Sequence, residues 1–362
     1  MPGKHRLCSS APGRLCLFGE HQDFLGLSVI ACPIDLRIQF AGTPRDDLLF
    51  SIDMPDIAAH DVLQPDGELD YLGERDYLRA AMNVLRRAGL RIVRGYDLTV
   101  TSHIPINAGT SSSSAMVIAW IKFLLETQEG EVPWDAVSIA KFGHAAEVKE
   151  FGEPGGMMDH CVAALGGLLC IDCAEPITVT PLPAQLDGFV LGDSLEKKPT
   201  TEILAKSKGD VRLGLDLLCR RIPGFDLKTT PLELAEPFLD DMPPDSARKL
   251  AANLVNRDLC QAARAMLSQA DFDPQQLGRL LTAHHTELRD GLGISTQKIE
   301  RLIQVSMRAG ALGAKINGSG GGGCMFAYAP GRQQAVKKAI DEAGGQGFIV
   351  KLDRGVTFTR EE

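Results

Sequence analysis

The feature that most constrains the fold is a loop of small and polar residues that runs into an apolar segment. Residues 104–115 read Ile-Pro-Ile-Asn-Ala-Gly-Thr-Ser-Ser-Ser-Ser-Ala, and residues 116–125 are largely apolar. Serine is a favoured helix N-cap, so we expect a helix to begin within the serine run. Backbone N–H groups, hydroxyls and the positive end of a helix dipole then meet at one point, which suits an anion and phosphate above all. The alternative is an ordinary helix cap.

A second glycine-rich run joins two strand-like segments near the end of the chain. Gly318, Gly320 and Gly323 fit the pattern G-x-G-x-x-G, but a dinucleotide fold needs a helix at the last glycine. An apolar, strand-like run follows here instead, so we reject that fold. A glycine run between strands lets the backbone approach another loop or a phosphate closely. The Gly-x4-Gly-Lys-Ser/Thr phosphate loop is absent, so any nucleotide is bound by another route.

A third segment, residues 11–26, places polar side chains after a short apolar strand. Glu20, His21 and Asp23 follow Gly19, and Arg14 stands before the strand. Clustered hydrogen-bond acceptors on a loop hinged by glycine suit a ligand with many hydroxyls. The alternative is a solvated turn.

Bulk composition narrows the class of protein. A chain of 362 residues suggests two domains, and 44% apolar with 23% charged residues is typical of a globular protein. The net charge of −9 argues against a general nucleic-acid or anionic-membrane surface. No apolar run is long enough to span a membrane, and the first residues lack a signal-peptide core. Nine scattered cysteines indicate reduced thiols, so we expect a cytoplasmic protein.

Hydrophobic periodicity divides the chain into a mixed first half and a helix-rich second half. We expect domains at residues 1–180 and 181–362. The expected strands are 28–40, 97–103, 167–172, 311–317, 324–328 and 347–353, and the expected helices are 77–88, 134–151, 198–221, 246–268, 275–291, 295–309 and 332–343.

Taken in order from Ala11 to Ala327, the three segments resemble the GHMP kinase superfamily, which includes galactokinase, homoserine kinase, mevalonate kinase and phosphomevalonate kinase. The first looks like the galactokinase signature, reading Gly13-Arg14 and then Gly19-Glu20-His21-x-Asp23-Phe24. Mevalonate kinases usually lack that Asp and carry Lys in place of Arg14. The run 143–160, with Glu147 and Asp159 twelve residues apart (159 − 147), also resembles galactokinases.

This resemblance implies a two-domain α+β fold. The N-terminal α/β domain would be of the ribosomal S5 domain 2 type, the C-terminal domain would be ferredoxin-like, and the active site would lie between them. The sequence also departs from galactokinases. Asn107 and Ala108 stand where galactokinases have two glycines, Thr110 replaces Leu and His160 replaces Gln. The sugar contacts of the second half are not recognisable, so galactose as the substrate does not follow.

The resemblance implies that Asp159 is the catalytic carboxylate, which orients the acceptor hydroxyl or takes its proton. The alternative is that Asp159 caps a helix starting near His160. Arg14 would lie beside Asp159, lower its pKa and stabilise the transferring phosphoryl group. Ser113 and Glu147 would be the magnesium ligands.

The remaining roles follow from the same resemblance. Glu20, His21 and Asp23 would bind sugar hydroxyls. The phosphates of ATP would be held by Asn107, Ala108, Gly109, Thr110, Ser111, Ser112, Ser113 and Ser114. The glycine run would brace this loop through Gly318, Gly320, Gly321 and Gly322.

The expected activity is the phosphorylation of a sugar hydroxyl, with the anomeric one favoured, by ATP with Mg²⁺. The partners would be a small sugar and ATP, with no nucleic acid and no membrane, in a monomer or homodimer. One alternative is a kinase for another small alcohol such as mevalonate. Another is a sensor that binds ATP and sugar without turnover. The negative net charge disfavours a nucleic-acid-binding protein.

Overall fold

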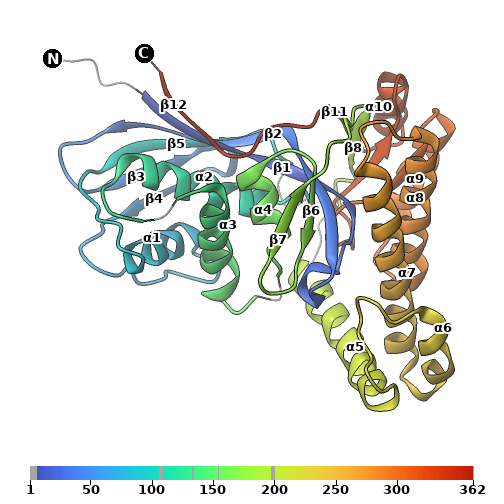
Figure 1. The fold of residues 1–362 in the computed structure, drawn as a ribbon. Helices are drawn as coiled ribbons and strands as arrows, with labels where there is room; N and C mark the ends of the chain where they lie inside the picture. Colours follow the sequence, from blue (N-terminus) through green and yellow to red (C-terminus); the bar gives the residue numbers. More distant parts are fainter. Residues whose placement is uncertain (1–5, 106–108, 133, 154, 197–199, 362) are drawn as a thin grey trace.

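The chain folds around two β-sheets that lie side by side, each with helices packed on it, in a computed structural model (Figure 1). The structure describes residues 6–105, 109–132, 134–153, 155–196 and 200–361. Among these residues, no helix is long and apolar enough to cross a membrane.

The larger sheet builds the first lobe. Its strands run in the order β12-β1-β2-β5-β3-β4, while β6 pairs with β2 and with β7. Strands β3 and β5 are parallel, and the other pairs are antiparallel. The strands are β1 (Arg6–Phe18), β2 (Ser28–Pro44), β3 (Phe50–Met54), β4 (Ala59–Leu63), β5 (Tyr96–Ser102), β6 (Leu169–Asp172), β7 (Thr178–Pro181) and β12 (Thr357–Glu361).

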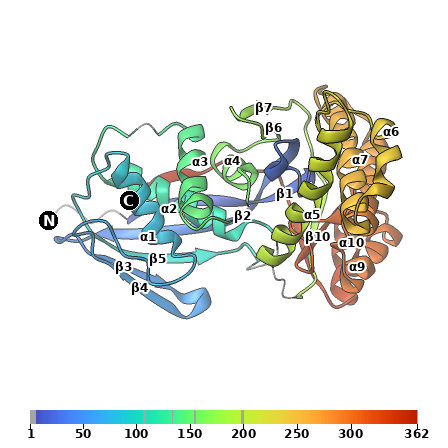
Figure 2. The same ribbon diagram turned by 90° about the horizontal axis from the view of Figure 1, so that it is seen from below.

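Helices α1 (Tyr77–Arg87), α2 (Ser112–Thr127), α3 (Ala136–His144) and α4 (Met158–Leu165) lie together on one side of this sheet (Figure 2). The π-helical turn η3 (Ala145–Lys149) continues α3. Helix α2 is buried on most of its surface because its apolar residues face the sheet and the other helices. Its Trp120 ring stacks on Phe40 at 5.4 Å and meets Phe50 edge-on at 5.5 Å. Short 3-10 turns lie at η1 (Asp23–Leu25) and η2 (Pro55–Ile57).

The smaller sheet builds the second lobe. Strands β8 (Phe189–Asp193), β9 (Gly313–Ile316), β10 (Cys324–Tyr328) and β11 (Gln346–Val350) pair in the order β11-β8-β10-β9, antiparallel throughout. Counted along the chain, this order is 4-1-3-2, with helices between the first and second strands and between the third and fourth. This is the ferredoxin-like arrangement that the sequence predicts. The helices are α5 (Thr200–Arg221), α6 (Leu232–Ala235), α7 (Pro244–Leu267), α8 (Pro274–Thr286), α9 (Gln297–Arg308) and α10 (Gln333–Glu342).

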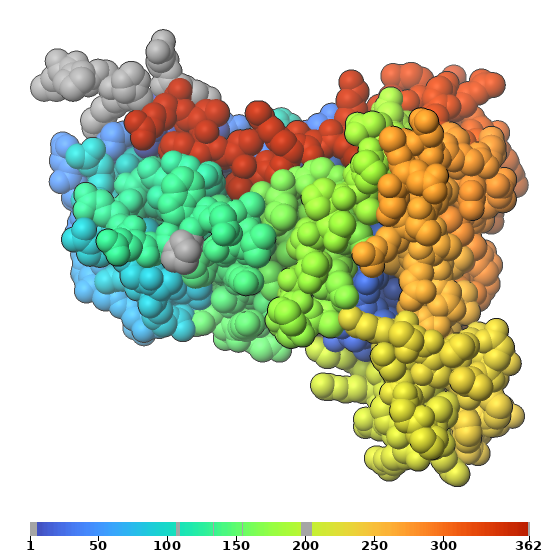
Figure 3. All heavy atoms as spheres, in the orientation of Figure 1, coloured from blue at the N-terminus to red at the C-terminus, as the bar shows by residue number. Residues whose placement is uncertain are grey.

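Part of the helical insertion between β8 and β9 projects from the second lobe, at the lower right of Figure 3. It consists of α5, α6, the 3-10 turn η4 (Glu236–Asp241) and the start of α7. These elements share a small apolar core that includes Val211, Leu218 and Leu250, and Leu25 of the first lobe packs against it. The π-helical turn η5 (Glu287–Gly291) extends α8.

The expected helices and strands overlap observed ones, and the differences are short or edge elements. Strands β3, β4, β7, β8 and β12, each of four or five residues, were not expected. The expected helix at 134–151 begins at Ala136 and ends in the π-helical turn. The domain boundary near residue 180 stays a prediction, and β12 joins the larger sheet from the far end of the chain.

The two tryptophans give a matched test of the first lobe's core. Trp120 is fully buried, whereas Trp134 is 49% exposed and lies under Lys122. We expect Trp120→Ala to lower the free energy of unfolding by about 3–5 kcal/mol, because it leaves a cavity beside two aromatic rings. The Trp134→Ala control should cost less than about 1 kcal/mol. Urea unfolding followed by circular dichroism measures both, and equal losses would contradict this description of the core.

Candidate active site

A pocket lies where three loops of the two lobes meet. We call these the polar loop (residues 19–26), the serine loop (residues 109–114) and the glycine loop (residues 317–323). The pocket is lined by Arg14 and Asp23, by residues 111–114, by Glu147 and Asp159, and from the second lobe by Gly318 and Ser319. Residues from both ends of the chain therefore share one cavity.

The serine loop places the N-terminus of helix α2 at the pocket. Helix α2 begins at Ser112, and Ser111 occupies the N-cap position with a positive φ of 59°. The expectation that the helix begins within the serine run is therefore confirmed. Thr110 is fully buried, its hydroxyl donates to the carbonyl of Pro105, and it is not among the described lining residues. Asn107 and Ala108 lie outside the described residues.

The guanidinium of Arg14 donates two hydrogen bonds to the carboxylate of Asp159. Arg14 Nε donates to Asp159 Oδ1 at 2.8 Å, and Nη2 donates to Oδ2 at 3.2 Å. Arg14 is buried, while the Asp159 side chain is 27% exposed and so remains accessible from the pocket. Burial disfavours the ionised carboxylate, but the charge and hydrogen bonds of Arg14, together with Ser111 and His160, outweigh it and lower the pKa of Asp159 below its usual value.

Asp159 lies in the first turn of α4, where the helix dipole favours a carboxylate. The N-cap position belongs to Met157, and the helix begins at Met158. The alternative that Asp159 serves as a helix cap is therefore wrong, and its carboxylate is turned to Arg14 instead.

Glu147 reaches the pocket from the π-helical turn η3, a type of irregularity that is common at functional sites. It is buried, and His160 Nε2 lies 2.8 Å from its Oε2. Burial raises the pKa of Glu147, but contacts with His160, Ser113 and Ser114 lower it further than burial raises it. An ionised carboxylate thus lies beside serine hydroxyls at a helix N-terminus.

This donor set fits Mg²⁺, which prefers hard oxygen ligands and keeps several waters. Among the described residues, no group of three or more His, Cys, Asp and Glu side chains could enclose a metal. A cation bound by Glu147 and Ser113 would therefore complete its shell with water and phosphate oxygens.

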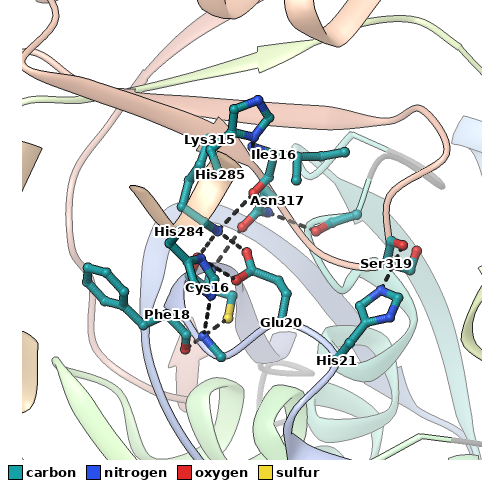
Figure 4. Close-up of polar contacts among 12 residues, drawn as sticks. Cys16, Phe18, Glu20, His21, His284, His285, Lys315, Ile316, Asn317 and Ser319 are labelled. Atoms are coloured by element: carbon teal, nitrogen blue, oxygen red, sulfur yellow. Dashed lines mark hydrogen bonds and ion pairs between the residues drawn. The ribbon is translucent and has the colours of Figure 1, made fainter. Parts of the chain in front are cut away.

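The three side chains of the polar loop differ in orientation. The buried carboxylate of Glu20 forms an ion pair with Lys315, and His21 Nε2 lies 2.9 Å from the carbonyl of Ser319 (Figure 4). Asp23 packs on the backbone of Gly156, where a Cβ atom would come within 2.5 Å of its Cγ. Burial, together with the nearby charge of Asp159, raises the pKa of Asp23 to about 6. The second lobe thus engages Glu20 and His21, whereas the Asp23 carboxylate lies near that of Asp159.

The glycine loop meets the serine loop directly. A Cβ atom on Gly318 would lie 2.7 Å from the carbonyl oxygen of Gly109, and the φ of Gly318 is +80°. The amide of Asn317 donates to the same carbonyl at 2.8 Å. Further along, Gly320 and Gly321 contact Ile294. Gly322 packs on the backbone of Glu196, so these glycines hold the loop to its own lobe.

Several residues at or beside the site were not predicted from the sequence. Asn317 and Lys315 lie beside the glycine run, but a single polar residue in an apolar strand carries no pattern. Arg75, Tyr77 and Glu153 line another wall of the pocket, where Glu153 accepts hydrogen bonds from both of the others. Glu153 is 78 residues from Arg75 (153 − 75), and residues that far apart form no motif that can be recognised in the sequence.

Three family models match the chain. The model described as "GHMP kinases N terminal domain" matches residues 76–167, and "GHMP kinases C terminal" matches residues 259–346. The model described as "Galactokinase galactose-binding signature" matches residues 3–44.

Curated relatives fall into two groups. Mevalonate kinase of Pyrococcus abyssi is 32% identical over 96% of this chain and 95% of its own length. Galactokinase of Actinobacillus succinogenes is 29% identical over 92% of this chain and 88% of its own length. Among solved structures, Lactococcus lactis galactokinase complexed with galactose superposes with a TM-score of 0.83 at 20% identity, covering 97% of this chain and 95% of the other.

The fold and the family matches together define a small-molecule kinase. The sequence matches extend over nearly the whole chain, and the chain belongs to the GHMP kinases. It is accordingly an ATP-dependent phosphotransferase that acts on a hydroxyl group.

The contact between the glycine and serine loops can be tested with two glycines of positive φ. At Gly318 a methyl group would collide with Gly109, whereas at Gly331, whose φ is +73°, nothing lies within 4 Å. We expect Gly318→Ala to raise the KM for ATP at least tenfold, because the serine loop must shift. Gly331→Ala carries the same backbone strain and should leave that KM within twofold of the parent. A similar KM for ATP in both variants would contradict the contact.

Proposed function

We propose that this kinase phosphorylates a monosaccharide at its anomeric hydroxyl. The observation that carries the proposal is the pair of carboxylates, Asp23 and Asp159, that share the pocket beside the N-terminus of α2. A carboxylate accepts hydrogen bonds from hydroxyls, so Asp23 suits an acceptor with several of them.

The charges of the pocket favour an uncharged acceptor. Of its described lining residues, Arg14 and Arg75 are the arginines, and each is paired with a carboxylate, Asp159 and Glu153 respectively. An acceptor that carried its own carboxylate would have to lie close to Asp23 and Asp159, which costs electrostatic energy in a partly buried site. The match of residues 3–44 to the galactose-binding signature also supports a sugar.

In the proposed mechanism, Asp159 accepts a hydrogen bond from the reacting hydroxyl and aligns its oxygen with the γ-phosphate. Because Arg14 holds the pKa of Asp159 low, orientation is the main task of this carboxylate. That suffices for phosphoryl transfer, since its loose transition state asks little of a base. The hydroxyl oxygen bonds to the γ-phosphorus as the bond from that phosphorus to the β-phosphate oxygen breaks, so ADP is the leaving group. The hydroxyl's proton passes to Asp159 or to solvent late in the transfer, and Arg14 stabilises the negative charge on the transferring group.

The proposed phosphate site is the N-terminus of α2, where backbone N–H groups and the hydroxyls of Ser111 and Ser112 face the pocket. Ser113 and Glu147 would hold Mg²⁺, which offsets the charge of the β- and γ-phosphates when it is bound. Asp23 would hold the sugar.

A second candidate acceptor is mevalonate. It is favoured by the relatives named mevalonate kinase, which are 30–33% identical to the chain in examples such as those of Pyrococcus abyssi, Thermococcus onnurineus and Thermococcus gammatolerans. Membership of the GHMP kinases, with Arg14, Ser113, Glu147 and Asp159 around one pocket, argues against a sensor without turnover.

The first experiment measures ADP release with magnesium-ATP against a panel of free monosaccharides, with mevalonate and homoserine included. Turnover with a sugar supports the proposal, and NMR of the product then locates the phosphate. Turnover with mevalonate alone overturns it in favour of the second candidate. ATP binding without turnover on any compound means that the acceptor lies outside the panel, which counts against the proposed sugars and against mevalonate alike.

Substitution of the proposed catalytic carboxylate provides a direct test. Asp159→Asn keeps the shape of the side chain and removes the charge that orients the hydroxyl. We expect kcat to fall by about 10²–10⁴ with the best acceptor. Asp46→Asn, at an exposed position, serves as the matched control and should keep the kcat of the parent. A value for Asp159→Asn within tenfold of the parent would refute the mechanism.

The raised pKa of Asp23 predicts how acceptor affinity depends on pH. The ionised form accepts hydroxyl hydrogen bonds, and it is lost as the pH falls below about 6. The KM for the acceptor should therefore rise as the pH falls, by about tenfold per unit well below 6, which is the limit for one proton.

Asp23→Asn is the reference for that measurement, since its amide does not titrate. We expect a higher KM for the acceptor that no longer changes between pH 5 and pH 7, while KM for ATP is followed in parallel. A similar pH dependence in Asp23→Asn and the parent would assign the titration to another group.

A further inference from the structure

The polar loop belongs to the first lobe by sequence but is fastened to the second lobe by four consecutive residues. Each contacts a different element: α8, β9, the glycine loop and α7. Figure 4 shows the first three of these contacts. The contacts are Gly19 N–H to His284 Nε2 at 3.2 Å, Glu20 to Lys315, His21 Nε2 to the Ser319 carbonyl at 2.9 Å, and Gln22 Nε2 to the Asn253 carbonyl at 2.8 Å.

Lys315 makes the charged contact of this set. It is fully buried on β9, and its ammonium donates to the carboxylate of Glu20, to the carbonyl of Cys16 at 3.0 Å and to that of Ile316 at 2.9 Å. An ammonium group has three N–H donors, so each of them has an acceptor. Lys315 is not among the described residues that line the pocket, and its place is behind the polar loop.

His284 completes the surroundings of Glu20. Since the backbone N–H of Gly19 donates to Nε2, that nitrogen carries no proton and the ring's N–H is on Nδ1. Nδ1 lies 3.6 Å from Glu20 Oε2. Burial and the charge of Lys315 hold the pKa of His284 well below its usual value, so the ring is neutral. The positive charge of Lys315 is thus balanced by the negative charge of Glu20, and the neutral ring of His284 lies beside them. Such balance and hydrogen bonding offset the cost of desolvating a buried ion pair.

Asn317, two residues after Lys315, reaches in the other direction. Its Nδ2 donates to Gly109 of the serine loop at 2.8 Å, and its Oδ1 accepts from the N–H of Cys16 at 2.9 Å. The end of β9 therefore holds the polar loop through one side chain and the serine loop through another.

We propose that Lys315 is a positioning residue for the acceptor: its ion pair with Glu20 sets the polar loop, and hence Asp23, against the phosphate site. The inference rests on the proposed function, in which Asp23 binds the acceptor. It assigns separate tasks to neighbouring side chains, since Lys315 fixes the acceptor side and Asn317 fixes the phosphate side. A buried ion pair contributes little net stability compared with apolar packing, which is consistent with a role in geometry.

The test uses the full chain with the double substitution Glu20→Gln/Lys315→Met, which removes both charges and leaves neither one buried alone. The surface substitution Lys337→Met, in an exposed pair with Asp341, is the matched control. Hydrogen exchange is measured at the amides of the polar loop that donate within the loop, those of Gln22, Leu25 and Gly26. Kinetics are measured with the acceptor found in the panel.

We expect the double variant to exchange these amides at least tenfold faster and to raise the KM for the acceptor at least tenfold, with the KM for ATP within twofold of the parent. Asn317→Ala should show the reverse pattern in KM, and Lys337→Met should match the parent. A folded double variant with parental exchange and kinetics overturns the proposal. An equal rise of both KM values in the two variants also overturns it, because that is the result of a generally loosened contact between the lobes.

If the double variant does not fold, Glu20→Asp replaces it. This variant keeps the charge pair but withdraws the carboxylate by one methylene group, so the same faster exchange and raised acceptor KM are expected. Parental values would again overturn the proposal. The exchange measurement needs no acceptor. It therefore still decides the positioning role if the parent phosphorylates nothing in the panel, which would count against the proposed function alone.

Discussion

Two lobes can form one active site only where their backbones come into close contact, and the approach of Gly318 to Gly109 is that place. A side chain on Gly318 would collide with the serine loop, so the lobes could not close to the same distance. Asn317 also donates a hydrogen bond to the carbonyl oxygen of Gly109. The geometry of the pocket, from the start of α2 to Asp159, depends on this contact.

Around that contact, the electrostatics of the site are arranged in pairs. Arg14 holds Asp159 ionised, His160 contacts Glu147, and Lys315 balances Glu20 in the interior. Asp23 is the exception, since burial and a neighbouring carboxylate raise its pKa instead of lowering it. A group held away from its preferred charge state binds a ligand more strongly when that ligand satisfies it, which distinguishes Asp23 from the carboxylates that are already paired.

The sequence predicted what local chemistry determines. A serine run before an apolar segment has one favourable arrangement, and α2 begins inside it. The strand pattern on each side of the glycine run likewise predicted β9 and β10. The sequence could not predict which polar residues of the polar loop are already paired with the second lobe. Glu20 and Asp23 look alike in sequence, and their fates differ because Lys315 lies 295 residues away, beside Glu20 alone. Strand β12 escaped for the same reason, since its partner is at the other end of the chain.

The pairing of β12 with β1 has a consequence for the order of folding. Arg6 pairs with Glu361 and Ser10 with Thr357, so the edge of β1 that faces β12 stays open until nearly all of the chain has been synthesised. An uncovered strand edge offers hydrogen-bonding groups to any other extended chain. Because a ribosome adds about 5–20 residues per second, the first lobe waits tens of seconds for its final strand. The nascent chain is therefore exposed to misassembly at β1 during this interval, a vulnerability that a chaperone bound early in translation would relieve.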